Sequence, residues 1–249
     1  VEKTALAEAE IEYFDRTSTT IYARFPVTKA GHPALEGATV VIWTTTPWTM
    51  PGNRATAYGE DIDYGVWRVD AAADDALARV GERLVVADAL ADTIAEACGI
   101  TGFTREDSVP TSAFADTVLK HPLNGKGYDH DVPMLPADYV TTEQGTGIVH
   151  IAPGHGAEDY VLGMAHGVPV PETVGADGRL MEHLPLFAGF SALKDNAKIA
   201  DLLAEEGCLG GRGQVTHSYP HSWRSHAPLI FRNTPQWFIS MESHGLRDT

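Results

Sequence analysis

Short apolar runs, most of them rich in β-branched residues, recur along the first two thirds of the chain. The run at 38–44 has the pattern of a buried strand, and residues 18–27, 63–69, 83–87 and 146–151 resemble it. Polar or turn-forming residues separate these runs. The pattern therefore predicts five strands dispersed along the sequence.

Three other segments have the apolar spacing of helices. Residues 88–98 place their apolar positions on one face, with Asp88 as a plausible N-cap and Gly99 directly after the last turn. Residues 156–166 and 195–206 show similar spacing. We expect a helix in each of the three segments.

Two segments are expected to lack a regular place in a sheet. Residues 132–141 contain Pro133 and Pro136, which predicts an edge strand or a loop. The glycines within 210–213 predict a flexible hinge. Strands outnumber helices and are spread along the chain, which predicts an α+β fold with a β-barrel core surrounded by helices.

Composition places the chain among folded globular domains. It has 249 residues and 43% apolar content, which is enough for the core of one large domain. Cys98 and Cys208 lie far apart without the spacing of a metal site, so we expect reduced thiols and a cytoplasmic location. No apolar run reaches the roughly 18 residues of a membrane span, so no membrane association is predicted.

The net charge of −16 argues against a free-standing nucleic-acid-binding protein, because phosphate contacts need Lys and Arg. Residues 208–241 are an exception, since they contain no Asp or Glu but include Arg212, Arg224 and Arg232. A polyanion could approach this stretch. Docking on another protein domain is the slightly favoured alternative.

A threonine-rich motif, WTTTPWTMPGNRA, occupies residues 43–55 directly after a predicted strand. Side chains alternate along an extended chain, so Thr44 and Thr46 should point one way and Thr45 the other. Hydroxyl groups clustered at a strand end suit a ribose or a water molecule. From the residues alone, an ordinary strand end is the commoner explanation, and a partly buried Trp48 is commoner than one that stacks on a base.

A second motif, at residues 145–160, runs from a strand through a Gly- and Pro-rich loop into a helix. Asp159 lies in the first helical turn, where it either compensates the helix dipole or binds an ammonium group. His150 at the strand end is more often structural than catalytic. His150, His155 and Asp159 could also bind a metal that activates water, but their spacing matches no established metal motif.

Together these two motifs resemble the editing domain of the class I aminoacyl-tRNA synthetases for isoleucine, valine and leucine. The sequence at 43–55, and the sequence APGHG at 152–156 preceded by His150, resemble those of the isoleucine branch. The resemblance extends over nearly the whole chain. It implies a single editing domain at 1–249, in which 1–15 and 235–249 lead to the catalytic body of a longer protein.

The resemblance implies a proofreading hydrolase that deacylates valyl-tRNA(Ile), with valyl-adenylate as a further candidate substrate. The implied partners are the acceptor end of the valine-mischarged tRNA and the catalytic body of the same synthetase, and neither a cofactor nor a metal is implied. Two alternatives stay open at this point. One is a non-catalytic module that binds the tRNA acceptor end, and the other is a metal-dependent hydrolase.

The resemblance also implies roles for particular residues. Asp159 would hold the α-ammonium group of the substrate, and three hydroxyl groups would place the attacking water: Thr44, Thr45 and Thr46. The remaining implied residues border the substrate: Trp48, Thr49, Asn53, His150 and Tyr219. Among these, His150 would limit the size of the amino-acid side chain and Tyr219 would contact the terminal nucleotide.

Overall fold

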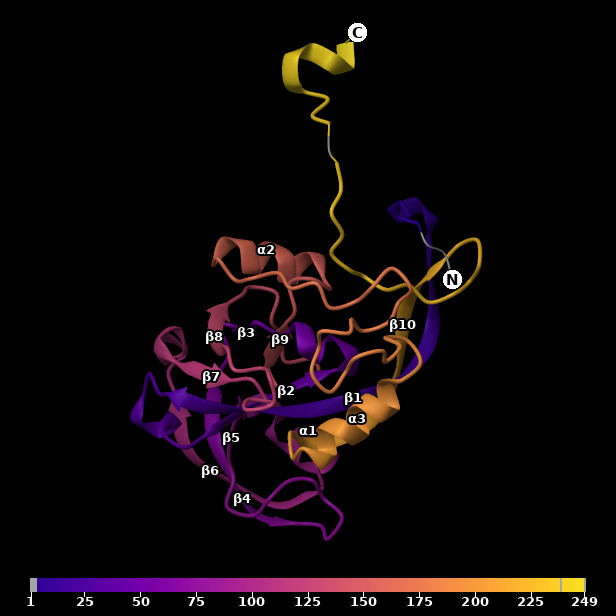
Figure 1. Ribbon diagram of the computed structural model, residues 1–249. Coiled ribbons are helices and arrows are strands. Elements are labelled where there is room, and N and C mark those ends of the chain that lie inside the picture. The colour runs from indigo at the N-terminus through magenta and orange to yellow at the C-terminus, as the bar shows by residue number, and fades with distance from the viewer. Residues whose placement is uncertain (1–3, 238, 249) are drawn as a thin grey trace.

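A curved sheet of ten strands organises the chain in the computed structural model, which describes residues 4–237 and 239–248 (Figure 1). The strands are β1 (Ile11–Lys29), β2 (Thr39–Thr44), β3 (Ala55–Tyr58), β4 (Tyr64–Ala72), β5 (Arg83–Ala87), β6 (Ile100–Val109), β7 (Val118–Lys120), β8 (Asp131–Pro136), β9 (Ile148–Ile151) and β10 (Leu209–Ser222). They lie in the order β6-β4-β5-β2-β1-β7-β8-β3-β9, and β10 pairs with β1 outside this path.

Helices are few and short. The α-helices are α1 (Ala91–Ala97), α2 (Ala157–Ala165) and α3 (Asn196–Glu205). The 3₁₀ turns are η1 (Glu8–Glu10), η2 (Pro33–Leu35), η3 (Pro47–Gly52), η4 (Asp88–Leu90), η5 (Thr111–Asp116) and η6 (Ser243–Asp248). None of the helices in the described part of the chain is long and apolar enough to cross a membrane.

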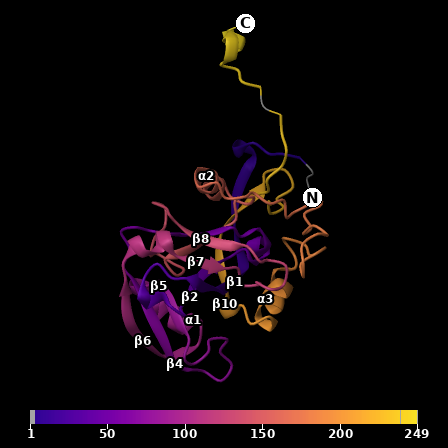
Figure 2. The same ribbon diagram turned by 60° about the vertical axis from the view of Figure 1, so that its left-hand side comes forward.

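Strand β1 holds the sheet together because it pairs with three other strands. Its residues 20–25 are buried on both faces, where β2 and β10 flank it, and its last residues pair with β7. Its first residues are largely exposed and form a two-stranded ribbon with the end of β10 (Figure 2). One strand therefore passes from the core to the edge of the molecule.

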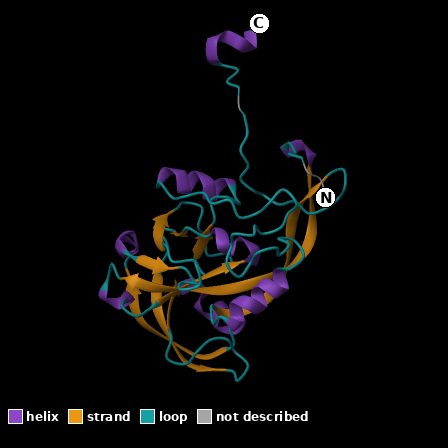
Figure 3. Cartoon of the chain, viewed as in Figure 1, coloured by secondary structure: helices purple, strands orange, loops and turns teal. Residues whose placement is uncertain are grey.

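The sheet curls so that β9, at one end of the strand order, packs against β2. The main core lies inside this curl and includes the fully buried Phe25, Ile42, Tyr64 and Phe114. Helices α1 and α3 pack on the strands from outside (Figure 3). The predicted α+β class, a β-barrel core surrounded by helices, is confirmed as a large curled sheet with few helices.

The local predictions were mostly correct, but three of them were wrong. Asp88 is not an N-cap, because its carboxylate accepts hydrogen bonds from Trp67 and Arg105 instead of from its own helix. Residues 210–213 are not a hinge: they pair with β1, and a side chain at Gly211 would lie 2.7 Å from the sulfur of Cys98, so glycine permits close packing there. Strand β8 is not an edge or loop, because it lies between β7 and β3. Pro133 is its third residue and Pro136 its last, which leaves the buried Met134 and Leu135 between them.

Candidate functional site

Strand β2 ends at Thr44 and the chain then turns into η3, so that residues 44–52 form a compact threonine turn. The hydroxyl of Thr44 accepts a hydrogen bond from the backbone N–H of Thr46 at 3.1 Å and lies 3.1 Å from the hydroxyl of Thr46. Pro47 begins η3, where its missing N–H costs nothing. Thr44 and Thr46 therefore lie on the same side, as their alternation predicts.

Thr45 differs from its two neighbours. Its side chain is partly exposed, and its hydroxyl makes no hydrogen bond with any residue that the structure describes. A free hydroxyl can both donate and accept. Thr45 is therefore the threonine of this turn whose hydroxyl is available to water or a ligand.

His150, at the end of β9, is buried against the threonine turn. The side-chain amide of Asn53 donates to its Nδ1 at 2.9 Å and also to the carbonyl of Ala55 at 2.8 Å, so Nδ1 carries no proton. Nε2–H then donates to the hydroxyl of Thr49 at 2.8 Å, and that hydroxyl donates to the carbonyl of Thr46. Burial lowers the pKa of His150 to about 3, so the ring is neutral and held in one tautomer.

Two of the predicted site residues are enclosed by the protein. Asn53 has no exposed surface, and Trp48 retains 4%. The ring of Trp48 packs edge-on against His155 with 4.8 Å between ring centroids. The structure thus places Asn53 and Trp48 behind the surface of the turn, and a border role for them stays a prediction.

Asp159 lies in the first turn of α2, which follows the loop at residues 152–156. One carboxylate oxygen, Oδ2, accepts a hydrogen bond from the backbone N–H of Ala152 at 2.7 Å. The other oxygen accepts none from the described residues. Burial raises the pKa of Asp159. Since Ala152 packs beside Gly52, the loop that anchors Asp159 lies directly against the threonine turn.

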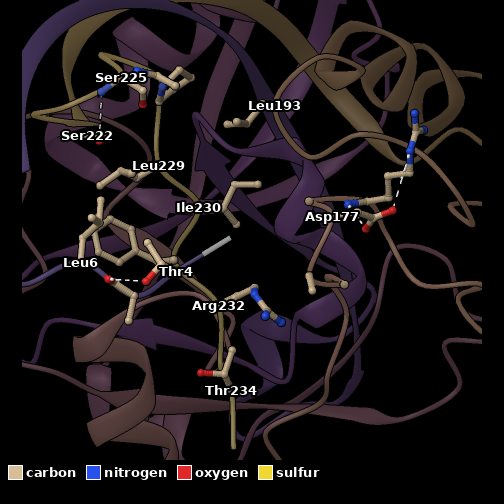
Figure 4. Close-up of a pocket in the computed structure, with 18 of the residues that line it drawn as sticks. Thr4, Leu6, Asp177, Leu193, Ser222, Ser225, Leu229, Ile230, Arg232 and Thr234 are labelled. Carbon is tan, nitrogen blue, oxygen red and sulfur yellow. Dashed lines mark hydrogen bonds and ion pairs between the residues drawn. The ribbon is translucent and has the colours of Figure 1, made fainter. Parts of the chain in front are cut away.

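The same loop contacts the carboxy-terminal segment through His155. Nδ1–H of His155 donates to the carbonyl of Phe231 at 2.9 Å, and Nε2 accepts from the hydroxyl of Thr173. Phe231 also lines a cavity of about 630 Å³ that contains Ile230, Arg232 and, on another segment, Asp177 (Figure 4). No residue of the threonine turn lines this cavity, so it is a separate feature from the candidate site.

Known proteins similar to this chain are isoleucine–tRNA ligases, although no family model matches it. The chain is 49% identical over 247 residues to the enzyme named so in Pelagibacter ubique, and 49% identical over 255 residues to that of Gluconobacter oxydans. It is 47% identical over 260 residues to that of Caulobacter vibrioides. The chain belongs to the isoleucine–tRNA ligase family. These alignments cover 97–99% of the chain but 26–27% of the relatives' length.

The fold of this chain is similar to a crystal structure described as GlLeuRS-CP1. The TM-score is 0.57 at 15% identity, and the match covers 76% of this chain and 96% of the other. The architecture of this chain is therefore similar to that of the CP1 domain in that structure. The family and the fold that the two motifs suggested are confirmed.

Tyr219 is the predicted site residue that the fold of this chain separates from the threonine turn. It lies on β10, its hydroxyl donates to the carbonyl of Leu229 at 3.0 Å, and the guanidinium of Arg16 lies 5.0 Å from its ring centre. Within the described residues, no hydrogen bond or ring contact joins it to the threonine turn. Its contact with a terminal nucleotide stays a prediction.

Three side chains that contact the threonine turn from behind were not found from the sequence: Arg54, His121 and His130. All three donate to backbone carbonyls at the end of η3. Arg54 falls inside the threonine-rich motif, but nothing in its spacing marks it. The two histidines lie in a loop-like stretch without any periodic pattern.

Proposed function

We propose that this segment is the editing site of its synthetase and hydrolyses the ester of valyl-tRNA(Ile), with valyl-adenylate as a further candidate substrate. One observation carries the proposal. A turn of threonine hydroxyls, fixed by a neutral buried His150, packs against the loop that holds Asp159 with one carboxylate oxygen unpaired. Hydroxyls suit the water and ribose of an aminoacyl ester, and a carboxylate suits its ammonium group.

The proposed roles follow from which side-chain oxygens have no hydrogen-bond partner among the described residues. Asp159 binds the α-ammonium through the oxygen that Ala152 leaves unpaired. The hydroxyl of Thr45, which has no partner in the described chain, holds the attacking water, while Thr44 and Thr46 fix the shape of the turn through their mutual contact. Positioning of this kind contributes to hydrolysis by aligning the reactants.

His150 provides the proposed size limit. A synthetic site for isoleucine rejects valine only weakly, because the side chains differ by one methylene; isoleucyl-tRNA synthetases are the established example of this limit. A second site that excludes the larger side chain completes the selection. A ring hydrogen-bonded at both nitrogens and buried in one orientation can serve as the rigid wall that such exclusion requires.

The hydrogen bonds of the two histidines do not favour the metal-dependent alternative. Both nitrogens of His150 are used by Asn53 and Thr49, and both nitrogens of His155 are used by Phe231 and Thr173. A metal needs a free nitrogen lone pair. Each ring would have to give up its present partners before it could bind a metal.

The proposed partners, in the cytoplasm, are the acceptor end of mischarged tRNA and the catalytic body of the same synthetase. Residues 1–15 and 235–249 are proposed to lead to that catalytic body. The chain carries a net charge of −16. Phosphate binding by such a surface is weak. The affinity for tRNA is therefore proposed to come mainly from the rest of the synthetase.

A deacylation assay on this chain with valyl-tRNA(Ile) tests the proposal. Asp159→Ala and Asp159→Asn should each abolish hydrolysis while circular dichroism shows an intact fold, because either change removes the charge that binds the ammonium. The adjacent exposed Glu158→Gln is the matched control and should retain wild-type activity. Unchanged hydrolysis in Asp159→Ala would sink the proposal, and binding without hydrolysis by the wild type would favour a tRNA-binding module.

A further inference from the structure

Three basic side chains bind the backbone carbonyls where η3 ends. Nε2–H of His121 donates to the carbonyl of Met50 at 2.9 Å. Nη1 of Arg54 donates to the carbonyl of Pro51 at 3.3 Å and to that of Asn53. The carbonyl of Met50 also accepts the backbone N–H of Asn53, and those of Pro51 and Asn53 lie where the turn has no further helical N–H to offer. The side chains therefore close the end of the threonine turn.

The carbonyl of Asn53 receives two of these hydrogen bonds. Besides Arg54, the Nε2–H of His130 donates to it at 2.9 Å, and Arg54 Nη1 lies 3.3 Å from the same nitrogen. A carbonyl oxygen has two lone pairs, and both are occupied here. The backbone of Asn53 is thus held from two directions.

Asn53 connects this arrangement to the candidate site. Its carbonyl is held by Arg54 and His130, while its side-chain amide donates to Nδ1 of His150. Any rotation of the Asn53 backbone would move that amide and release the ring. The orientation of His150 therefore depends on two residues that do not contact it.

Burial of the Arg54 guanidinium at the end of this turn is energetically unfavourable. No carboxylate pairs with it among the described residues, and burial lowers its pKa. A partly buried guanidinium without a counter-charge opposes stability. Its hydrogen bonds go to the carbonyls of the turn, so the gain it provides is the geometry of that turn.

We infer that Arg54 and His130 are positioning residues for the proposed ester hydrolysis, acting through Asn53 to fix the tautomer and orientation of His150. The inference rests on the proposed function. Neither residue touches the substrate. Their loss should loosen the threonine turn that His150 fixes and so lower the rate of the chemical step. Substrate binding should stay nearly unchanged, because the ammonium contact at Asp159 is separate.

Paired variants test this inference. Arg54→Met and His130→Leu remove the donors, while Arg54→Lys and His130→Gln retain a donor near the same place. We expect the removing variants to lower kcat for valyl-tRNA(Ile) by about 10- to 100-fold with KM within about twofold. The donor-retaining variants should recover most of the rate. ¹⁵N NMR of the His150 ring should show loss of the single neutral tautomer in the removing variants.

Arg83→Met is the matched control, because Arg83 donates to the carbonyls of Ala34 and Glu36 around a different turn, η2. It should leave both kcat and the His150 signals unchanged. If Arg54→Met does not fold, His130→Leu decides alone, since that ring is only partly buried.

Failure of the positioning role and failure of the proposed function give different results. Wild-type rates and an unchanged His150 spectrum in His130→Leu would overturn the positioning role. A wild-type chain that hydrolyses no valyl-tRNA(Ile) would instead overturn the proposed function, and the NMR comparison would still decide whether Arg54 and His130 fix the ring.

Discussion

The hydroxyl of Thr49 offers a direct test of what holds His150 in place. It accepts from Nε2–H of His150 at 2.8 Å and donates to the carbonyl of Thr46 at 2.8 Å, and Thr49 is 5% exposed. Thr49→Val preserves the shape of the side chain but removes both bonds. The imidazole N–H then stays buried without an acceptor.

The expected cost follows from these two bonds. Loss of the bond to Thr46 costs about 1 kcal/mol, and the unpaired N–H of His150 costs about 1–2 kcal/mol more. The free energy of unfolding should therefore fall by about 2–3 kcal/mol, which lowers Tm by roughly 4–12 °C for a chain of this size. Urea denaturation followed by circular dichroism measures the change.

Thr45→Val is the matched control for Thr49→Val, because the Thr45 hydroxyl has no hydrogen-bond partner in the described structure and its side chain is partly exposed. It should change stability by less than about 0.5 kcal/mol and yet slow deacylation, since this hydroxyl is the proposed ligand of the water. Equal unfolding midpoints for the two variants would refute the reasoning that the Thr49–His150 bond stabilises the site.

Three further predictions concern pH and packing. Because the pKa of Asp159 is raised, kcat/KM for valyl-tRNA(Ile) should fall as the pH decreases and the carboxylate loses its charge, with a midpoint above the usual carboxyl pKa of about 4. A midpoint at or below that value would contradict this prediction. His121 and His150 have pKa values of about 3 in the folded state. Unfolding therefore takes up protons below about pH 6.5. As the pH falls from there toward 3, each ring should lower the free energy of unfolding by about 1.4 kcal/mol per pH unit. His150→Gln should reduce this slope, which urea denaturation at a series of pH values measures. Gly211→Ala should destabilise the chain by about 1–3 kcal/mol, because its Cβ would lie 2.7 Å from the sulfur of Cys98, whereas Gly210→Ala, with 3.9 Å to its nearest neighbour, should unfold like the wild type.

Features fixed by neighbouring residues could be predicted from the sequence. The β-branched run before Thr44 is β2. The helical segment that begins at Asp88 ends at Gly99, whose φ is 67°. The alternation that put Thr44 and Thr46 on one side needed only the geometry of an extended chain. These outcomes depend on contacts within a few residues, and the local pattern therefore decides them.

Strands whose pattern is set by distant partners could not be predicted. β6 has five consecutive exposed polar residues, 104–108, and is held by its pairing with β4. β8 contains two prolines yet lies between β7 and β3. Residues 210–213 look flexible, but their glycines allow the backbone to approach Cys98. In each case burial and pairing outweigh local preference.

The sequence by itself determined the family, the strand end at the threonines and the helix with Asp159 in its first turn, because these follow from the order of neighbouring residues. Only the tertiary structure decided how they act together. Pairing of β3 with β9 sets Thr56 opposite His150, and this brings Asn53 and Thr49 to a ring about a hundred residues away. The same folding puts Arg54 beside His130. No local pattern encodes such contacts, since a buried hydrogen bond forms only where distant strands bring donor and acceptor together out of water.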